Sequence, residues 1–127
     1  MTLSEQINLL AEALRSAGSA LFITGAGISA ESGLPTYRGV SGLYNRPTED
    51  GVEIEEALSG DMFRRNPGLT WKYILEIERA CRGAEPSSAH LALTQICQKT
   101  HRAWVLTQNV DGLHRLALCP NLIEIHG

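Results

Sequence analysis

Residues 24–39 read TGAGISAESGLPTYRG, and they follow the apolar run ALFI at positions 20–23. A short apolar run that leads into a glycine turn and a small-residue segment is typical of the first strand and phosphate-binding turn of a doubly wound α/β fold. In that pattern Gly25 permits the tight turn, Gly27 lets backbone amides approach a pyrophosphate, and Ala30 lets the helix pack close to the strand. Short glycine-rich stretches also occur as ordinary turns, so the rest of the chain decides the interpretation.

Length and composition bound the kind of protein. The chain has 127 residues, enough for about one domain, and its 43% hydrophobic and 20% charged residues are ordinary for a globular protein. A formal net charge of −3 provides no basic surface, so we expect no nucleic acid and no membrane as partner. No apolar run approaches the ~20 residues that span a bilayer, and the N-terminus lacks a basic signal-peptide region. We therefore expect a cytoplasmic protein.

The three cysteines, Cys81, Cys97 and Cys119, contain no C-x-x-C pair. An odd number at this spacing argues against a disulfide framework and against a structural zinc site. We expect free thiols and no metal ligands in this chain.

Local signals predict helices and strands in alternation. Thr2 and Glu5 match a capping box, and Asn66 followed by Pro67 is typical of a helix start. The expected elements are helices at about 4–17, 26–33, 53–58, 67–82, from 86 onward and 111–118, and strands at about 20–24, 103–107 and 122–125. In the helix at 67–82 the expected apolar stripe consists of Trp71, Ile74, Ile77 and Cys81.

Residues 39–65 are rich in glycine and polar residues and are expected to be mostly loop. Strands separated by helices predict a parallel sheet with right-handed crossovers. The fold class is therefore α/β, a Rossmann-like parallel sheet of three strands with a small helical and loop insertion at 40–85.

Chemically distinctive segments follow all three expected strands. The glycine turn follows the first strand, residues 108–111 (QNVD) follow the second, and His126 follows the third. Ligands of such sheets bind outside the carboxyl ends of the strands, so we expect these segments to share one crevice.

The segments TGAGISAESGLPTYRG, TQNVDGLH and IEIHG, in this order, resemble those of the sirtuins, which are NAD-dependent protein lysine deacylases. The resemblance covers nearly all of this chain and about the first half of the family's catalytic domain. It implies NAD as the cofactor, an acylated lysine of a protein or peptide as the substrate, and transfer of the acyl group to ADP-ribose with release of nicotinamide. The four-cysteine zinc site expected in the family is absent from this chain.

The resemblance also implies a truncated NAD-binding domain over residues 1–127. Only three strands of the sheet are present, and an exposed parallel edge invites association. We therefore expect either a missing C-terminal half or self-association through the open sheet edge.

In the glycine turn, the resemblance assigns cofactor contacts to a short set of residues. These are Gly25, Ala26, Gly27 and Ala30 near the pyrophosphate, Tyr37 over the nicotinamide ribose, and Arg38 on phosphate.

After the later strands, the resemblance assigns the ribose, the nicotinamide and the catalytic base. Gln108 and Asn109 would bind ribose hydroxyls, with Asn109 also holding an ordered water. Asp111 and the backbone of Val110 would bind the nicotinamide carboxamide. His126 would be the general base that takes a proton from a ribose hydroxyl, a role that suits histidine as a residue type because its side chain exchanges protons near neutral pH. The assigned catalytic residues are therefore His126 and Asn109.

The residues also allow plainer interpretations. Arg38 suits a surface cation, Tyr37 a packing aromatic, Asp111 a helix cap, and His126 a structural histidine. The other histidines are expected to have no part in the chemistry: His90, His101 and His114.

Other functions stay open beside the deacylase. One is a non-catalytic NAD or ADP-ribose-binding fragment, and another is an NAD glycohydrolase. A dehydrogenase is disfavoured, because the acidic residue expected about 20 positions after the glycine turn has only Glu49 and Asp50 as candidates, in the loop-rich stretch.

Three departures from the family pattern carry expectations. Thr36-Tyr37-Arg38 replaces Asp-Phe-Arg, which looks tolerable. The stretch 73–78 (YILEIE) lacks the Tyr-x-x-Arg of members that prefer acidic acyl groups, which favours an uncharged acyl group. Ala117-Leu118 replaces Ala-Gly after the QNVD segment, which predicts a different turn there.

Overall fold

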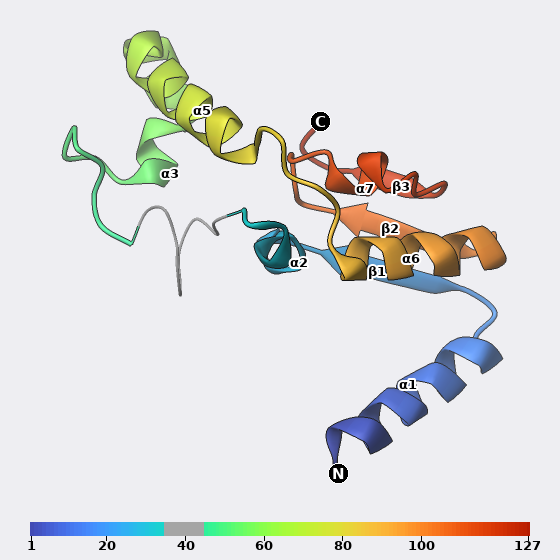
Figure 1. Ribbon diagram of the computed structural model, residues 1–127. Helices are drawn as coiled ribbons and strands as arrows, with labels where there is room; N and C mark the ends of the chain where they lie inside the picture. The colour runs from blue at the N-terminus through green and yellow to red at the C-terminus, as the bar shows by residue number, and fades with distance from the viewer. Residues whose placement is uncertain (35–44) are drawn as a thin grey trace. The chain divides into compact units, whose positions relative to one another are not determined.

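The computed structural model describes residues 1–34 and 45–127 (Figure 1). It contains two compact units. One consists of Met1–Thr24 with Ser88–Gly127 and holds the sheet, and the other is Gly25–Ser87.

The sheet has three parallel strands in the order β1-β2-β3, as the sequence predicts. The strands are β1 (Ala20–Thr24), β2 (Ala103–Thr107) and β3 (Leu122–Glu124). Val105, in the central strand, lies opposite Phe22 on one side and Leu122 on the other. The α/β class and the parallel sheet are confirmed.

One face of the sheet is packed against a helix, and the other is exposed. Helix α6 (Ser88–Lys99) lies along one face, as Figure 1 shows. The core on this face consists of Cys97, Ala103 and Val105, with Ala20, Phe22, Leu93, Ile96, Cys119 and Leu122 packed around them. On the other face Leu21, Ile23 and Trp104 are exposed. Strands that are apolar at nearly every position are typical of sheets that are covered on both faces. In the part of the chain that the structure describes, only the face under α6 is covered.

Helix α1 (Leu3–Ser16) begins with the predicted capping box. The Glu5 amide donates to Thr2 Oγ1 at 3.3 Å, and the Thr2 amide donates to Glu5 Oε2 at 2.6 Å. No residue of α1 is buried, so local capping and propensity specify this helix rather than packing. Among the described residues, no helix combines the length and apolar character required to cross a bilayer.

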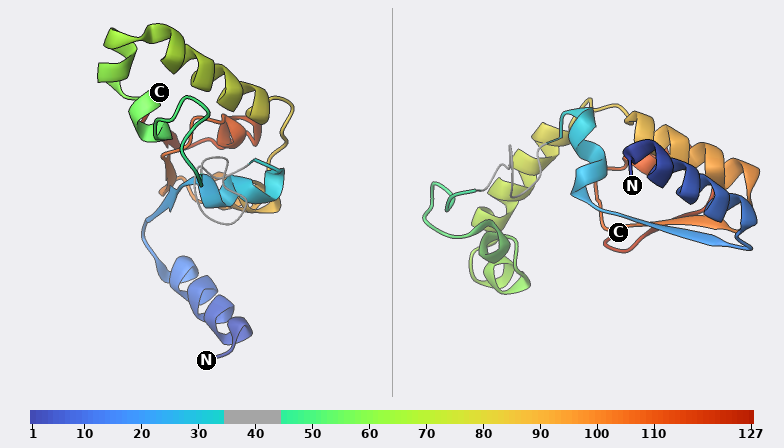
Figure 2. Two further views of the ribbon diagram at one scale, coloured as in Figure 1. Left: turned by 90° about the vertical axis from the view of Figure 1, so that its left-hand side faces the viewer. Right: turned by 90° about the horizontal axis from the view of Figure 1, so that it is seen from below.

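The unit Gly25–Ser87 is helical where the structure describes it. Its helices are α2 (Ala26–Ser29), the 3-10 turn η1 (Ala30–Ser32), α3 (Ile54–Ala57), α4 (Gly60–Arg65) and α5 (Pro67–Cys81). Helices α3 and α5 lie together in Figures 1 and 2, around a core of Ile54, Ala57 and Tyr73. Asn66 caps α5 as predicted, since its Oδ1 accepts from the Leu69 amide at 3.3 Å.

Helix α4 is an element that the sequence pattern does not predict, because Gly60 falls at the end of the loop-rich stretch. Ser59 caps this helix, and its Oγ accepts from the Met62 amide at 3.0 Å. A serine cap outweighs one glycine at the first helical position, where helix propensity matters least.

The predicted apolar stripe of α5 was only partly right, because Ile77 packs against the core whereas Trp71 and Ile74 are exposed. Thr70 and Tyr73 are the buried residues of α5, and about half of Trp71 is exposed, against the edge of Phe63. Thr70 is buried because its Oγ1 donates to the carbonyl of Ala57 at 2.8 Å. A hydroxyl that is satisfied in this way can face a core, which an apolar count cannot anticipate.

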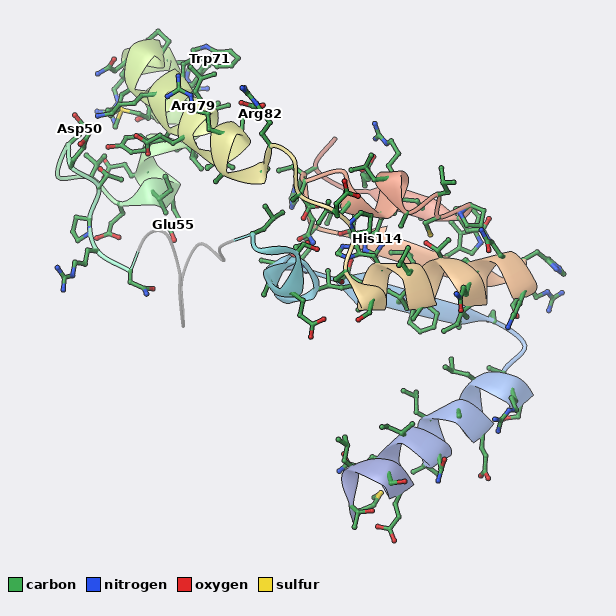
Figure 3. The ribbon with its side chains drawn as sticks, in the orientation of Figure 1. Asp50, Glu55, Trp71, Arg79, Arg82 and His114 are labelled. Carbon is green, nitrogen blue, oxygen red and sulfur yellow. The ribbon has the colours of Figure 1, made fainter. Side chains whose placement is uncertain are left out.

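The turn before α3 is fastened to α5 through Asp50 (Figure 3). Its Oδ2 accepts from Lys72 Nζ at 2.7 Å and from the Tyr73 hydroxyl at 2.5 Å, and Lys72 also pairs with Glu49. Lys72 and then Tyr73 lower the pKa of Asp50. Both acidic candidates for a dehydrogenase ribose contact are thus engaged with a lysine of their own unit.

The turn after α7 (Leu113–Leu116) is closed by two backbone hydrogen bonds. The Leu118 amide donates to the Arg115 carbonyl at 3.0 Å, and the Cys119 amide donates to the His114 carbonyl at 3.1 Å. This pair of hydrogen bonds is a Schellman motif, which places Leu118 in the left-handed region at φ 61°. Leu118 thus adopts a left-handed backbone conformation that favours glycine, at the position where the sequence has Ala117-Leu118 in place of Ala-Gly.

Replacing Leu118 by glycine should raise the free energy of unfolding by about 1 kcal/mol, since a β-carbon is strained at positive φ and the exposed side chain contributes little packing. Urea unfolding followed by circular dichroism measures the change. Leu116→Gly is the matched control, because Leu116 is also exposed but helical, and it should lower stability by about 1 kcal/mol. A Leu118→Gly variant less stable than the parent would contradict the strain.

Candidate functional site

The carboxyl ends of the three strands lie at one edge of the sheet. Their last residues, Thr24, Thr107 and Glu124, lie opposite one another in one row across the three strands. The Gln108 amide donates to the Thr24 carbonyl at 3.0 Å, and the Ile125 amide donates to the Thr107 carbonyl at 3.2 Å. The segments that follow β2 and β3 therefore leave the sheet at the same edge, as the sequence predicts for a ligand site.

The predicted site residues at this edge are accessible. Gln108, Val110 and His126 are exposed, and Asn109 and Asp111 are partly exposed. A ligand can therefore reach these side chains, as binding and proton transfer require.

The polar row at the end of the sheet bonds to the segment that follows β2. Thr24 Oγ1 lies 2.9 Å from His114 Nε2, and Thr107 Oγ1 accepts from the Asn109 amide at 3.1 Å. Glu124 forms an ion pair with Arg115. All three polar side chains of the row thus hold residues 109–115.

His90 and His114, which the sequence leaves without a role, are fully buried, with exposed fractions of 0% and 1%. Their rings meet edge to face with centroids 4.7 Å apart, and Figure 3 shows His114 between α7 and α6. Burial lowers the pKa of both residues; His90 lowers that of His114 further, while Asp111 opposes both shifts. The pair is therefore held neutral near pH 7. The signal that could have found them is their position on the core-facing sides of α6 and α7.

Asp111 has a structural contact that agrees with the plainer interpretation of this residue. Its Oδ1 accepts from the Leu113 amide at 3.0 Å, at the start of α7. The contact fixes the carboxylate on the loop through one oxygen, which is compatible with binding a ligand.

The glycine turn begins directly after Thr24. Gly25 precedes α2 in an extended conformation (φ −138°, ψ −165°), and neither Gly25 nor Gly27 has a positive φ. A β-carbon built on either would meet no described atom within 4 Å. Gly25 is therefore not required by its backbone conformation, contrary to the sequence argument. Open space at both glycines fits a close approach of a ligand to the backbone.

Ala30 is exposed, and α2 lasts a single turn before the 3-10 turn η1. Tyr37 and Arg38 lie outside the described residues. Within the described ranges, no three side chains of the metal-binding types gather to hold a metal ion.

Residues 25–127 match the sequence model of the Sir2 family. The chain belongs to the Sir2 family. This finding confirms the resemblance to the sirtuins.

Two curated Sir2 relatives show how much of the family's length is present. The chain is 62% identical over 119 residues to NAD-dependent protein deacylase 2 of Pseudomonas syringae pv. tomato, covering 92% of this chain and 48% of the relative. It is 54% identical over 123 residues to NAD-dependent protein deacylase 2 of Pseudomonas aeruginosa, covering 95% of this chain and 48% of the relative. The chain thus spans about half the length of these relatives.

Solved Sir2 structures share the fold. One, described as "Structural Basis for the Mechanism and Regulation of Sir2 Enzymes", matches with a TM-score of 0.81 at 37% identity over 98% of this chain and 47% of its own. Another, described as "Sir2-p53 peptide-NAD+", matches with a TM-score of 0.75 at 30% identity, over 100% of this chain and 46% of its own.

The buried histidines should make stability depend on pH. Because their pKa values are lower in the folded state, the unfolded chain binds more protons once the pH falls below about 6.5, and the free energy of unfolding then decreases. The decrease should level off below the folded-state pKa values. Urea unfolding between about pH 7.5 and 5 should show this slope, and His114→Gln should reduce it.

The control for this pH series is His101→Gln, which removes an exposed histidine from the same unit. It should keep the parental slope. An unchanged slope in His114→Gln would mean that His114 is protonated equally in the folded and unfolded chains.

Proposed function

We propose that this chain provides the NAD-binding part of an NAD-dependent protein lysine deacylase. The main support is the pair of open positions at Gly25 and Gly27, directly after a strand whose end is bonded to the Gln108 segment. Its Sir2 relatives from two Pseudomonas species bear the name NAD-dependent protein deacylase. Because the chain spans about half of each, the complete activity belongs to this proposal.

In the proposed cofactor site, different predicted residues bind different parts of NAD. The backbone of Gly25, Ala26 and Gly27 accepts the pyrophosphate, because the first amides of a helix have no acceptor within it. Ala30 is small and exposed beside them. Tyr37 and Arg38 are assigned to the nicotinamide ribose and to phosphate by their place in the family motif.

The segment after β2 is proposed to hold the sugar and the nicotinamide. Gln108 and Asn109 hydrogen-bond to ribose hydroxyls, and Asp111 with the Val110 backbone binds the carboxamide. When bound, NAD supplies the anomeric carbon whose bond to nicotinamide breaks. His126 is exposed and takes the proton of a ribose hydroxyl as the acyl group passes to the sugar.

The proposed substrate is an acylated lysine of a protein or peptide. The solved Sir2 relative described with a p53 peptide and NAD+ supports a peptide substrate. Absence of the Tyr-x-x-Arg pattern from positions 73–78 supports an uncharged acyl group such as acetyl, since no cation of that pattern would meet an acyl carboxylate.

Two further points complete the proposal. None of the cysteines that the structure describes forms a disulfide, which supports a cytoplasmic location. The sheet has an exposed apolar face with Leu21, Ile23 and Trp104, which supports a partner that covers it. That partner is either a C-terminal half, such as the longer relatives have, or a second copy of this chain.

An assay with NAD and an acetylated peptide tests the activity. Nicotinamide release that depends on the peptide, together with loss of the acetyl group, supports the deacylase. His126→Ala should lower deacylation by about 10²- to 10⁴-fold, as expected for a lost general base, and should still bind ADP-ribose. His101→Ala, another exposed histidine, is the control and should keep the parental rate.

The same assay separates the alternatives. Nicotinamide release without any peptide would indicate an NAD glycohydrolase. Binding of ADP-ribose without turnover would indicate a non-catalytic fragment.

Gly27→Ala should separate cofactor binding from folding. The new methyl group meets no described atom within 4 Å and Gly27 is helical, so the free energy of unfolding should stay level or rise by up to about 1 kcal/mol. Affinity for ADP-ribose, measured by titration calorimetry, should fall at least about tenfold, because the methyl group occupies the path of the pyrophosphate.

Gly68→Ala is the matched control for Gly27→Ala. Gly68 is also the second residue of its helix, and a β-carbon there would have only an ordinary contact, 3.7 Å from Asn66 Oδ1. It should leave the affinity for ADP-ribose unchanged. Equal affinities of Gly27→Ala and the parent would contradict a pyrophosphate at this turn.

A further inference from the structure

The last row of the sheet is chemically unlike the rows before it. On the face that α6 covers, the earlier positions are small or apolar, as in Phe22, Val105 and Leu122. The last row on that face is Thr24, Thr107 and Glu124. Burying polar side chains at such positions is costly unless they are hydrogen-bonded, and packing alone would be served by apolar residues.

Every member of this row is bonded to the same segment. The partners are the His114 ring, the Asn109 amide and the Arg115 side chain. These partners lie on both sides of Asp111 in the sequence. The row therefore fixes the loop that carries the proposed ribose and nicotinamide contacts.

The Thr24–His114 contact is the partly buried member of this set that links β1 to the loop. It joins residues 90 positions apart, and the His114 ring is 1% exposed and packed against His90. Thr24 directly precedes the glycine turn, and His114 follows Asp111 by three residues. Beside the backbone bond from the Gln108 amide to the Thr24 carbonyl, this side-chain bond connects the strand that leads into the proposed pyrophosphate site with the loop of the proposed nicotinamide site.

The protonation of His114 follows from its surroundings. Nε2 faces Thr24 Oγ1, whereas Nδ1 is buried and has no hydrogen-bond partner among the described residues. A buried N–H without an acceptor is rarer than a buried acceptor without a donor. The proton of the neutral ring therefore belongs on Nε2, which donates to the Thr24 hydroxyl.

We propose that Thr24 and His114 are a positioning pair, which holds the 108–111 loop in the geometry that binds the NAD-derived ligand without touching it. The inference rests on the proposed NAD site for its effect on binding. Its effect on the loop can be measured without any ligand.

The decisive comparison is Thr24→Val against Thr24→Ser. Valine has the shape of threonine but cannot accept the proton of Nε2, whereas serine keeps the hydroxyl. Thr24→Val should lower the affinity for ADP-ribose about three- to tenfold, which corresponds to the loss of one hydrogen bond, and Thr24→Ser should stay within about twofold of the parent.

A readout without ligand tests the positioning itself. Amide hydrogen exchange of the free protein should be faster at Asn109 and Leu113 in Thr24→Val than in the parent, because both amides bond to side chains that order the loop. Thr24→Ser should keep the parental exchange. The ¹⁵N spectrum of His114 should show a protonated Nε2 and a bare Nδ1 in the parent.

Thr94→Val is the matched control for loss of a buried threonine hydroxyl. Thr94 lies on the buried side of α6, and its Oγ1 has no hydrogen-bond partner among the described residues. This variant should leave both the loop exchange and the affinity for ADP-ribose unchanged. An equal effect of Thr94→Val and Thr24→Val would show that only general packing was disturbed, and would overturn the positioning pair.

The outcomes distinguish this inference from the proposed function. A parent protein that binds no ADP-ribose, with exchange that still responds to Thr24→Val and not to Thr24→Ser, would remove the NAD site but keep the positioning of the loop. Parental exchange and affinity in Thr24→Val, or equal losses in Thr24→Val and Thr24→Ser, would overturn the pair.

Discussion

The parallel pairing of β1 with β2 is the constraint on which the rest of the sheet unit depends. It brings Ala20 opposite Ala103 and Thr24 opposite Thr107, although the two strands are far apart in the sequence. Closing so long a loop costs conformational entropy, which grows only slowly with loop length. The burial of Val105 and its neighbours against α6 offsets that cost. Once the pairing is fixed, the strand ends lie together without further specification.

The same pairing separates two tasks along each strand. Residues in the first rows supply apolar surface for the core, and residues in the last row supply hydrogen bonds to the loop beyond. His90 and His114 extend this polar region into the interior, where burial keeps the two rings neutral. A neutral imidazole can bond to a hydroxyl without the desolvation cost of a buried charge. The unit therefore accepts polar groups in its interior where they order the residues of the proposed site.

Much of this fold could be predicted from the sequence, because the decisive signals are local. The apolar run before Gly25 marks β1, and the capping residues Thr2 and Asn66 mark two helix starts within a residue of their observed positions. The glycine turn, the QNVD segment and His126 are recognisable by residue type and order. Each of these signals depends on only a few neighbouring residues.

The parts that the sequence did not reveal depend on tertiary partners. Thr70 is buried because Ala57 offers a carbonyl, and His114 because Thr24 offers a hydroxyl. Neither partner is near in sequence, so an apolar count places such residues on the surface. Leu118 is a different case, since its left-handed backbone is imposed by the two hydrogen bonds of the turn rather than favoured by the residue.

Alternation along β2 has a consequence for changes in chain length. Side chains of a strand face opposite sides in turn, so one extra residue inside β2 reverses the facing of every position after it. Such an insertion after Val105 would turn Thr107 toward the open face and remove its bond to the Asn109 amide. The same insertion before Ala103 can bulge out of the surface turn. Insertions and deletions in natural relatives should therefore occur in that turn, and insertions or deletions of an odd number of residues should be rare within the strand.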